Sequence, residues 1–178
     1  WYPTDRMMHA PEDQECWGAE WRPGRNFRTV DDLFTKRNLW ALAAIREGIG
    51  GLADVEAANI MLFALNAILL NCSVLYRYRP SLKGGIMQGT YYLPQENQII
   101  SVWRSFEDKV NHIRSVAGQI QLASGDVIVS TQSCIDMQSI TAESVDYIFT
   151  DPPYAEKVQY GELNFVWEAW LGFDTHWH

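Results

Sequence analysis

Cysteine is scarce in this chain, and its spacing limits the kinds of site that the chain can build. The 178 residues contain three cysteines, Cys16, Cys72 and Cys134, and no two of them form a Cys-x-x-Cys pair. This pattern argues against a zinc ribbon and against a disulfide framework. The four histidines are scattered and form no metal-ligand spacing with cysteine or aspartate. We therefore expect no metal site and a reducing, cytoplasmic environment.

A secretory leader and a long hydrophobic run are both missing. The first residues show no positively charged stretch followed by an apolar one, which is the pattern of a signal peptide. The most apolar stretch, Ala57 to Leu70, is shorter than the ~20 residues of a bilayer span, and it contains Asn59 and Asn66. We interpret this stretch as a buried helix.

Basic residues are also few. The chain has 14 lysines and arginines and 22 acidic residues, which gives a net charge of −8. This balance argues against a protein that coats nucleic acid through its overall charge. Two local basic clusters could still contact phosphates, but each taken alone is better explained as a solvated face. The first cluster contains Arg22, Arg25, Arg28, Lys36 and Arg37, and the second contains Arg77, Arg79 and Lys83.

Apolar and aromatic residues are abundant: 47% of the chain is hydrophobic and 13% is aromatic. This composition predicts a globular protein of one or two domains. The chain begins at Trp1 and ends at Trp177-His178, just after an aromatic segment. We therefore expect a fragment of a longer protein.

Helical periodicity dominates the first two thirds of the chain. Thr35 is a typical N-cap for a helix that runs to about Ile49. The second predicted helix is apolar nearly all round, so it should be enclosed by other elements. The predicted ranges after the first helix are Asp54 to Tyr76, Ser101 to Ala117 and Glu162 to Leu171.

The last third suggests strands. Apolar, β-branched residues predict strands at Val127 to Ser130 and at Tyr147 to Thr150, joined by a short helical crossover at Cys134 to Ile140. A further short strand is predicted at Thr90 to Leu93. The expected fold class is α/β, with part of a nucleotide-binding-type parallel sheet after a helical subdomain. The predicted domains are residues 1–118 and 119–178.

The sequence Asp151-Pro152-Pro153-Tyr154 directly follows the apolar run Val145 to Thr150. Ligands of open α/β sheets bind at the carboxyl ends of such strands. A carboxylate, a proline-stiffened backbone and an aromatic ring suit the chemistry of an exocyclic amine on a flipped base. The Asp151 side chain and the Pro152 carbonyl can accept the hydrogen bonds of the amine, and Tyr154 can stack on the base.

This motif and its flanks resemble the S-adenosylmethionine-dependent amino-methyltransferases of DNA. The segments "DDLFTKRNLWALAAI" and "TDPPYAEKVQYGELNFVWEAWL" are further similar to the large prokaryotic adenine-specific DNA methylases. The resemblance implies a partial Rossmann-like methyltransferase sheet, S-adenosylmethionine as cofactor, DNA as partner, and catalytic roles for Asp151, Pro152, Pro153 and Tyr154. Adenine N6 is the expected target, and cytosine N4 stays open.

The family's Phe-x-Gly-x-Gly cofactor loop has no counterpart here. Neither Gly48-Ile49-Gly50-Gly51 nor Gly84-Gly85 has the strand-turn-helix context that such a loop needs. We expect the remainder of a parent methyltransferase to carry this loop, and no cofactor-binding residue is assigned to this chain. Beyond the motif, Lys157, Tyr160 and Glu162 are candidate substrate-binding residues.

Two other functions stay open from the residues. Related Asp-Pro-Pro-Tyr motifs serve RNA guanine-N2 methyltransferases, which do the same chemistry on another nucleic acid. The chain could instead be a non-catalytic interaction or DNA-positioning domain, since the cofactor loop is missing from it.

Overall fold

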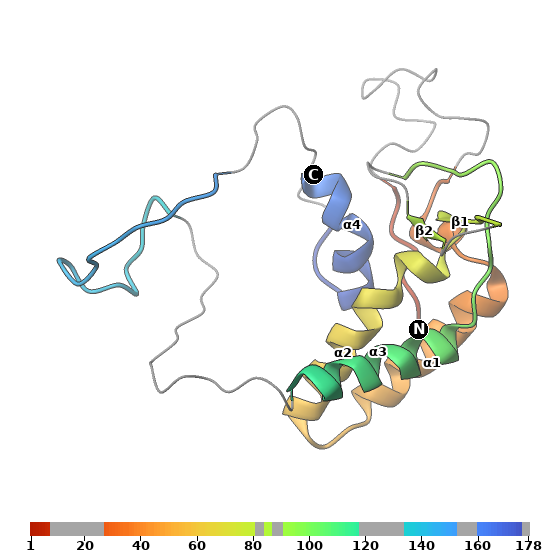
Figure 1. Cartoon of the computed structure of the whole chain (residues 1–178), viewed down its shortest axis with the longest axis horizontal. Helices are drawn as coiled ribbons and strands as arrows, with labels where there is room; N and C mark the ends of the chain where they lie inside the picture. The colour runs from red at the N-terminus through yellow and green to blue at the C-terminus, as the bar shows by residue number, and fades with distance from the viewer. Residues whose placement is uncertain (8–26, 81–83, 87–90, 118–133, 153–159, 176–178) are drawn as a thin grey trace.

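The computed structural model describes residues 1–7, 27–80, 84–86, 91–117, 134–152 and 160–175 (Figure 1). Helices dominate these residues, and the one sheet is a two-stranded antiparallel hairpin. The elements in chain order are η2 (Val30–Leu33), α1 (Lys36–Gly50), α2 (Val55–Ile68), η3 (Leu70–Cys72), β1 (Tyr76–Arg77), β2 (Gly85–Ile86), α3 (Val102–Ala117) and α4 (Tyr160–Leu171).

The predicted α/β fold with a partial Rossmann-like parallel sheet is therefore wrong for the described part of the chain. The predicted strand at Tyr147 to Thr150 carries no sheet hydrogen bonds, and Cys134 to Ile140 contains turns and no helix. An apolar run forms a strand only where neighbouring strands pair with it, because an isolated strand leaves its backbone groups without partners. The other predicted strand, Val127 to Ser130, lies outside the described residues. The domain boundary near residue 118 stays a prediction.

Helix α1 begins where the sequence indicates. The Thr35 side chain accepts a hydrogen bond from the backbone N–H of Asn38 at 3.3 Å, which satisfies one free donor of the first turn. Gly51 follows the last helical residue, and its N–H bonds back to the Glu47 carbonyl at 3.2 Å. The predicted helix from Thr35 to about Ile49 is thus confirmed at both ends.

Helix α2 begins as predicted and ends early. The Asp54 carboxylate accepts hydrogen bonds from the backbone N–H groups of Glu56 and Ala57 at 3.0 and 3.1 Å. The helix ends at Ile68, eight residues before the predicted end at Tyr76. There the Ser73 hydroxyl donates to the Leu70 carbonyl at 2.6 Å, and it accepts from a backbone N–H two residues later. A serine that bonds to the local backbone competes with continued helix, and β1 follows.

The hairpin of β1 and β2 pairs Tyr76 with Ile86 and Arg77 with Gly85. Gly84 precedes β2 and allows the two strands to approach closely. A Cβ at Gly84 would lie 2.5 Å from the Arg77 carbonyl oxygen, so only glycine fits without a shift of the backbone. The short strand that the sequence predicts near Leu93 is absent from the described residues 91–93.

The core lies between α1, α2, α3 and α4. Its fully buried side chains include Leu42 of α1, Leu65 of α2 and Phe165 of α4. The rings of Phe34 and Trp170 meet edge to face with their centroids 5.7 Å apart. The predicted helices at Ser101 to Ala117 and at Glu162 to Leu171 are both confirmed, the latter starting two residues earlier than expected.

Helix α4 is fastened to α1 and α2 by polar contacts as well as by packing. The Arg46 Nε donates to the Trp170 carbonyl at 2.7 Å, at the C-terminal end of α4. The Trp167 indole donates to the Asn66 carbonyl at 2.9 Å. Just beyond α4, the Thr175 hydroxyl donates to the Asp5 carboxylate at 2.9 Å. These contacts fix the helix that follows the Asp-Pro-Pro-Tyr sequence.

One face of α2 stays uncovered by the described residues, although the sequence predicts a fully enclosed helix. Val55 is 72% exposed and Phe63 is 65% exposed, and Ile60 between them is exposed as well. The helices that pack on α2 cover its other side, where Ala64, Leu65 and Ile68 are buried. A helix that is apolar on all sides therefore retains an apolar surface here.

Candidate functional site

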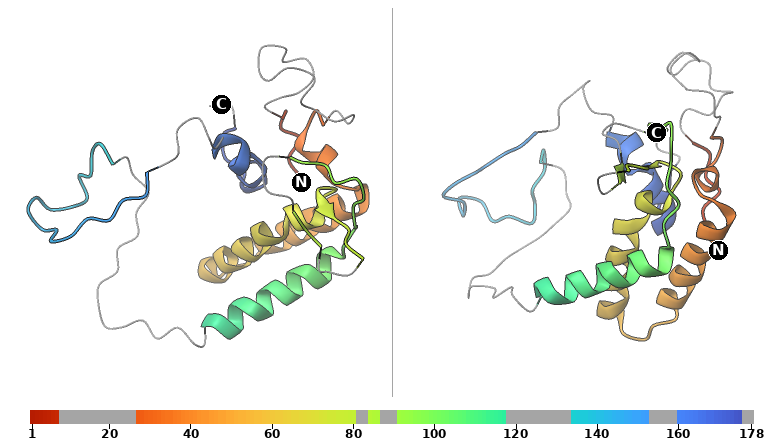
Figure 2. Two further views of the ribbon diagram at one scale, coloured as in Figure 1. Left: turned by 45° about the horizontal axis from the view of Figure 1, so that its top comes forward. Right: turned by 45° about the vertical axis from the view of Figure 1, so that its right-hand side comes forward.

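Asp151 and Pro152, the first two residues of the predicted catalytic turn, lie at the end of a loop of residues 134–152. Figures 1 and 2 show this loop standing away from the helices in every view. Asp151 and Pro152 are both exposed, and no described residue donates a hydrogen bond to the Asp151 carboxylate. Pro153, Tyr154 and Lys157 lie outside the described residues. Asp151 and the Pro152 carbonyl are thus accessible to a ligand.

The apolar residues before this turn are exposed too. We call Val145–Phe149 the apolar segment. Tyr147 is 80% exposed, Ile148 68% and Phe149 82%, while Val145 is 50% exposed. Consecutive large apolar residues in water are costly, because each fully buried side chain of this size gains about 1.5–3 kcal/mol. The exposure of the apolar segment is typical of a surface that binds another apolar surface.

The two further candidate residues on α4 lie in different surroundings. Tyr160 is the first residue of α4 and is 43% exposed. Glu162 is only 4% exposed, and its carbonyl accepts a hydrogen bond from the Tyr91 hydroxyl. Tyr160 therefore lies on the surface, and the Glu162 side chain lies in the interior. Their roles in binding a substrate stay predictions.

Tyr91 is a residue that sequence reasoning missed. Its backbone has φ +53°, a left-handed conformation that is uncommon for a bulky side chain. Burial raises the pKa of its phenol above the ordinary value, and the carboxylates of Glu162 and Glu168 add to the shift. Tyr91 therefore stays a neutral hydrogen-bond donor to α4. The sequence around it, between glycine-rich and proline-containing stretches, gave no signal of this contact.

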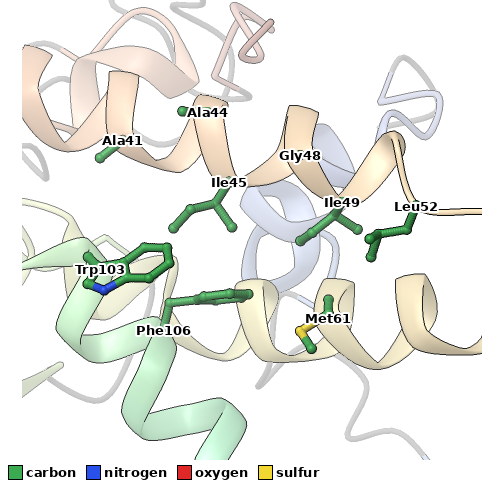
Figure 3. A pocket seen from close by; sticks show the side chains of 9 residues that line it. All are labelled: Ala41, Ala44, Ile45, Gly48, Ile49, Leu52, Met61, Trp103 and Phe106. Carbon is green, nitrogen blue, oxygen red and sulfur yellow. The ribbon is translucent and has the colours of Figure 1, made fainter.

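An apolar groove lies between α1, α2 and α3 (Figure 3). We call it the α1–α3 groove, and its volume is about 580 Å³. In Figure 3 the side chains of Ile45 and Ile49 approach it from α1, Met61 from α2, and Trp103 and Phe106 from α3. The full lining consists of Ala41, Ala44, Ile45, Gly48, Ile49, Leu52, Met61, Trp103 and Phe106.

This groove does not fit the cofactor that the resemblance implies. S-adenosylmethionine carries a sulfonium charge, an amino acid group and an adenine, all of which need polar partners in a binding site. The lining contains no charged side chain, and its only side-chain hydrogen-bond donor is the indole of Trp103. The groove therefore suits an apolar or aromatic side chain.

The basic clusters are only partly within the described residues. Lys36 and Arg37 are exposed in the first turn of α1, and Arg79 is exposed after β1. Arg77 is half-buried, and its Nε has no hydrogen-bond partner in the described part of the chain. Arg22, Arg25 and Lys83 are outside the described residues. No helix of the described residues is long and apolar enough to cross a bilayer, and those residues hold no group of three potential metal ligands.

Comparisons of the chain with protein-family models, with curated proteins and with solved structures gave no match.

Proposed function

We propose that this chain is the base-binding part of an S-adenosylmethionine-dependent DNA amino-methyltransferase that acts on the N6 amine of adenine. The observation that carries the proposal is the Asp151-Pro152 pair at the start of the Asp-Pro-Pro-Tyr sequence, exposed at the end of the apolar segment. An accessible carboxylate followed by a stiff backbone carbonyl is the arrangement that amine recognition needs.

The chemistry of the amine explains these residue types. The lone pair of an exocyclic amine is delocalised into the base, so the amine is a weak nucleophile. Asp151 accepts a hydrogen bond from one N–H of the amine, and the Pro152 carbonyl accepts one from the other. Both acceptors stabilise positive charge as it develops on the nitrogen. The two consecutive prolines restrict the backbone, which keeps the second acceptor in place. Tyr154 stacks on the flipped base.

The proposal assigns the cofactor to another part of the methyltransferase. The α1–α3 groove lacks the polar lining that S-adenosylmethionine needs, so the proposal gives this chain the base side of the site alone.

A non-catalytic interaction or DNA-positioning domain is the second candidate function. The apolar lining of the α1–α3 groove and the uncovered face of α2 favour it, because these surfaces suit a protein contact better than a reaction. In this reading the Asp-Pro-Pro-Tyr sequence would be a stiff turn without a chemical role.

The test compares two aspartates of the same loop. The natural polypeptide that contains this chain is assayed for labelled methyl transfer from S-adenosylmethionine to unmethylated DNA. Asp151→Ala should lower kcat by at least about 100-fold, as expected for removal of a charged group that acts in the transition state. Asp146→Ala, also exposed and with the same change of charge, should leave the rate within about twofold.

Equal rates for the Asp151→Ala variant and the parent would contradict the proposed role. Calorimetric titration of S-adenosylmethionine into this chain alone gives a second check. The proposal expects no measurable binding, and micromolar binding would show that the chain holds a cofactor site of its own.

A further inference from the structure

Two apolar surfaces of this chain lack a cover among the described residues. One is the α1–α3 groove, with its volume of about 580 Å³ and a lining that is almost entirely apolar. The other is the apolar segment Val145–Phe149, whose large side chains are 50–82% exposed. Each surface is of the kind that gains free energy when it is removed from water. The two are complementary, since one is concave and the other is a narrow, extended stretch.

We propose that the apolar segment docks in the α1–α3 groove of its own chain. The segment would lie in the groove with Tyr147 and Phe149 inserted between α1 and α3, so that the loop that carries Asp151 is held against the helices. The proposal does not depend on the chemistry of Asp151, and it goes beyond the function proposed above.

The spacing of the side chains fits the groove. In an extended segment alternate side chains point to the same side, about 7 Å apart. The backbone bends at Asp146 and runs without a bend from Tyr147 to Thr150. Tyr147 and Phe149 therefore share one side, and they are the residues that a groove can take. The walls offer matching partners, because Trp103 and Phe106 lie on α3 opposite Ile45 of α1 (Figure 3). Contacts between the aromatic rings of the apolar segment and those of the groove wall add stabilisation beyond that of the apolar area they bury.

The chain can reach the groove from the N-terminal side. The connection to the segment starts at Ala117, the last residue of α3, and α3 itself forms one wall of the groove. From Phe106 to Ala117 the helix rises by roughly 16 Å. The connection from Ala117 to Val145 spans 28 residue steps (145 − 117), and even a third of its extended length, about 30 Å, exceeds that rise.

The chain can also reach the groove from the C-terminal side. Arg46 is the neighbour of Ile45, which lines the groove, and its Nε lies 2.7 Å from the Trp170 carbonyl. From Trp170 back to Tyr160, α4 rises by about 15 Å. The start of α4 is thus separated from α1 by that rise and one arginine side chain. The 11 steps from Phe149 to Tyr160 (160 − 149) extend to roughly 36 Å, which covers the separation.

The experiment follows the methyl group of Met61, which lies in the groove and senses aromatic rings that enter it. Methyl-labelled wild-type chain is compared by NMR with the double variant Tyr147→Ser/Phe149→Ser. Both substituted residues are exposed, so the variant keeps the helical core. The proposal expects a different Met61 shift in the two proteins. It also expects that a synthetic peptide of residues 141–152, added to the double variant, returns the shift towards the wild-type value with saturation.

A blocking variant and its control sharpen the test. Ala44 is exposed and lines the groove, so Ala44→Arg should obstruct docking and weaken peptide binding by about tenfold or more. Ala117→Arg makes the same change on an exposed residue outside the groove and should leave peptide binding unchanged. An identical Met61 shift in the wild type and the double variant would overturn the proposal. A shift difference that disappears on dilution would overturn it as well, because it would assign the occupant to a second copy of the chain.

Discussion

Arg46 is expected to contribute to stability by joining α1 to the C-terminal end of α4. Its Nε donates to the Trp170 carbonyl at 2.7 Å, and its guanidinium lies 4.1 Å from the centre of the Trp1 ring. A carbonyl in the last turn of a helix carries partial negative charge, which favours a cation there. Burial lowers the pKa of Arg46, but the guanidinium remains charged at neutral pH.

The magnitude follows from these contacts. A hydrogen bond to a charged group contributes about 1.5–3 kcal/mol, and an exposed cation–π contact adds about 0.5–1 kcal/mol. The Nη2 atom lies 3.5 Å from the Leu171 carbonyl, which is too long for a strong hydrogen bond. Arg46→Met keeps the apolar stem and removes the charge. The two contributions sum to about 2–4 kcal/mol. Because Arg46 is only partly buried, we expect the lower end of this range, a fall of about 2 kcal/mol in the free energy of unfolding or roughly 4–8 °C in Tm.

Urea unfolding followed by circular dichroism measures this change. Arg104→Met is the matched control, because Arg104 is exposed on α3 and should contribute less than about 0.5 kcal/mol. A double-mutant cycle with Trp1→Ala separates the cation–π contact from the hydrogen bond. A loss below about 0.5 kcal/mol for Arg46→Met would refute the reasoning, and so would equal losses for Arg46→Met and the control.

Three further predictions concern buried polar groups. Asn38 is 2% exposed and donates to the carbonyls of Cys72 and Ile100 at 2.9 and 3.2 Å, so Asn38→Ala should cost about 2–4 kcal/mol in denaturant unfolding. The raised pKa of Tyr91 means that above pH ~10 its phenol loses a proton in the unfolded chain and keeps it in the folded chain. The free energy of unfolding should therefore fall by up to about 1.4 kcal/mol per pH unit as the pH rises. The Tyr91→Phe variant should lack this pH dependence. Burial raises the pKa of Cys72 to about 12, so its thiol stays protonated and unreactive at pH 8. Iodoacetamide at this pH should label the exposed Cys134 quickly and Cys72 only after the chain unfolds. Mass spectrometry of the peptides measures both labelling rates.

Local signals in the sequence predicted the starts of α1 and α2 well because each of these starts has a residue-level cause. Thr35 and Asp54 both cap their helices through side-chain oxygens, as their residue types indicate. The end of α2 was missed because it depends on the Ser73 hydroxyl bonding to the local backbone, which competes with a helix that is favourable by composition. The hydrophobic pattern alone does not show whether the helix or the local serine hydrogen bond is more favourable.

The sheet and the surroundings of the candidate site depend on partners that the local pattern does not contain. Val145–Phe149 has the composition of a buried strand, yet burial requires neighbouring strands or a covering surface, and the described residues place none beside it. The hydrogen bond between Tyr91 and Glu162 joins residues 71 positions apart, and the sequence near either residue contains no pattern that predicts it. Asp151 and Pro152 could be proposed from the sequence because the chemistry expected of them is local to four residues, and their role stays a prediction.

The central claim is that Asp151 and Pro152 hold the amine of adenine during methyl transfer. Nucleoside mass spectrometry tests it most directly, on DNA and RNA from cells that express the natural polypeptide containing this chain or its Asp151→Ala variant. The account predicts N6-methyladenine in DNA with the parent polypeptide and only background levels with the variant. N2-methylguanine in RNA, or no methylated nucleoside that depends on Asp151, would contradict it.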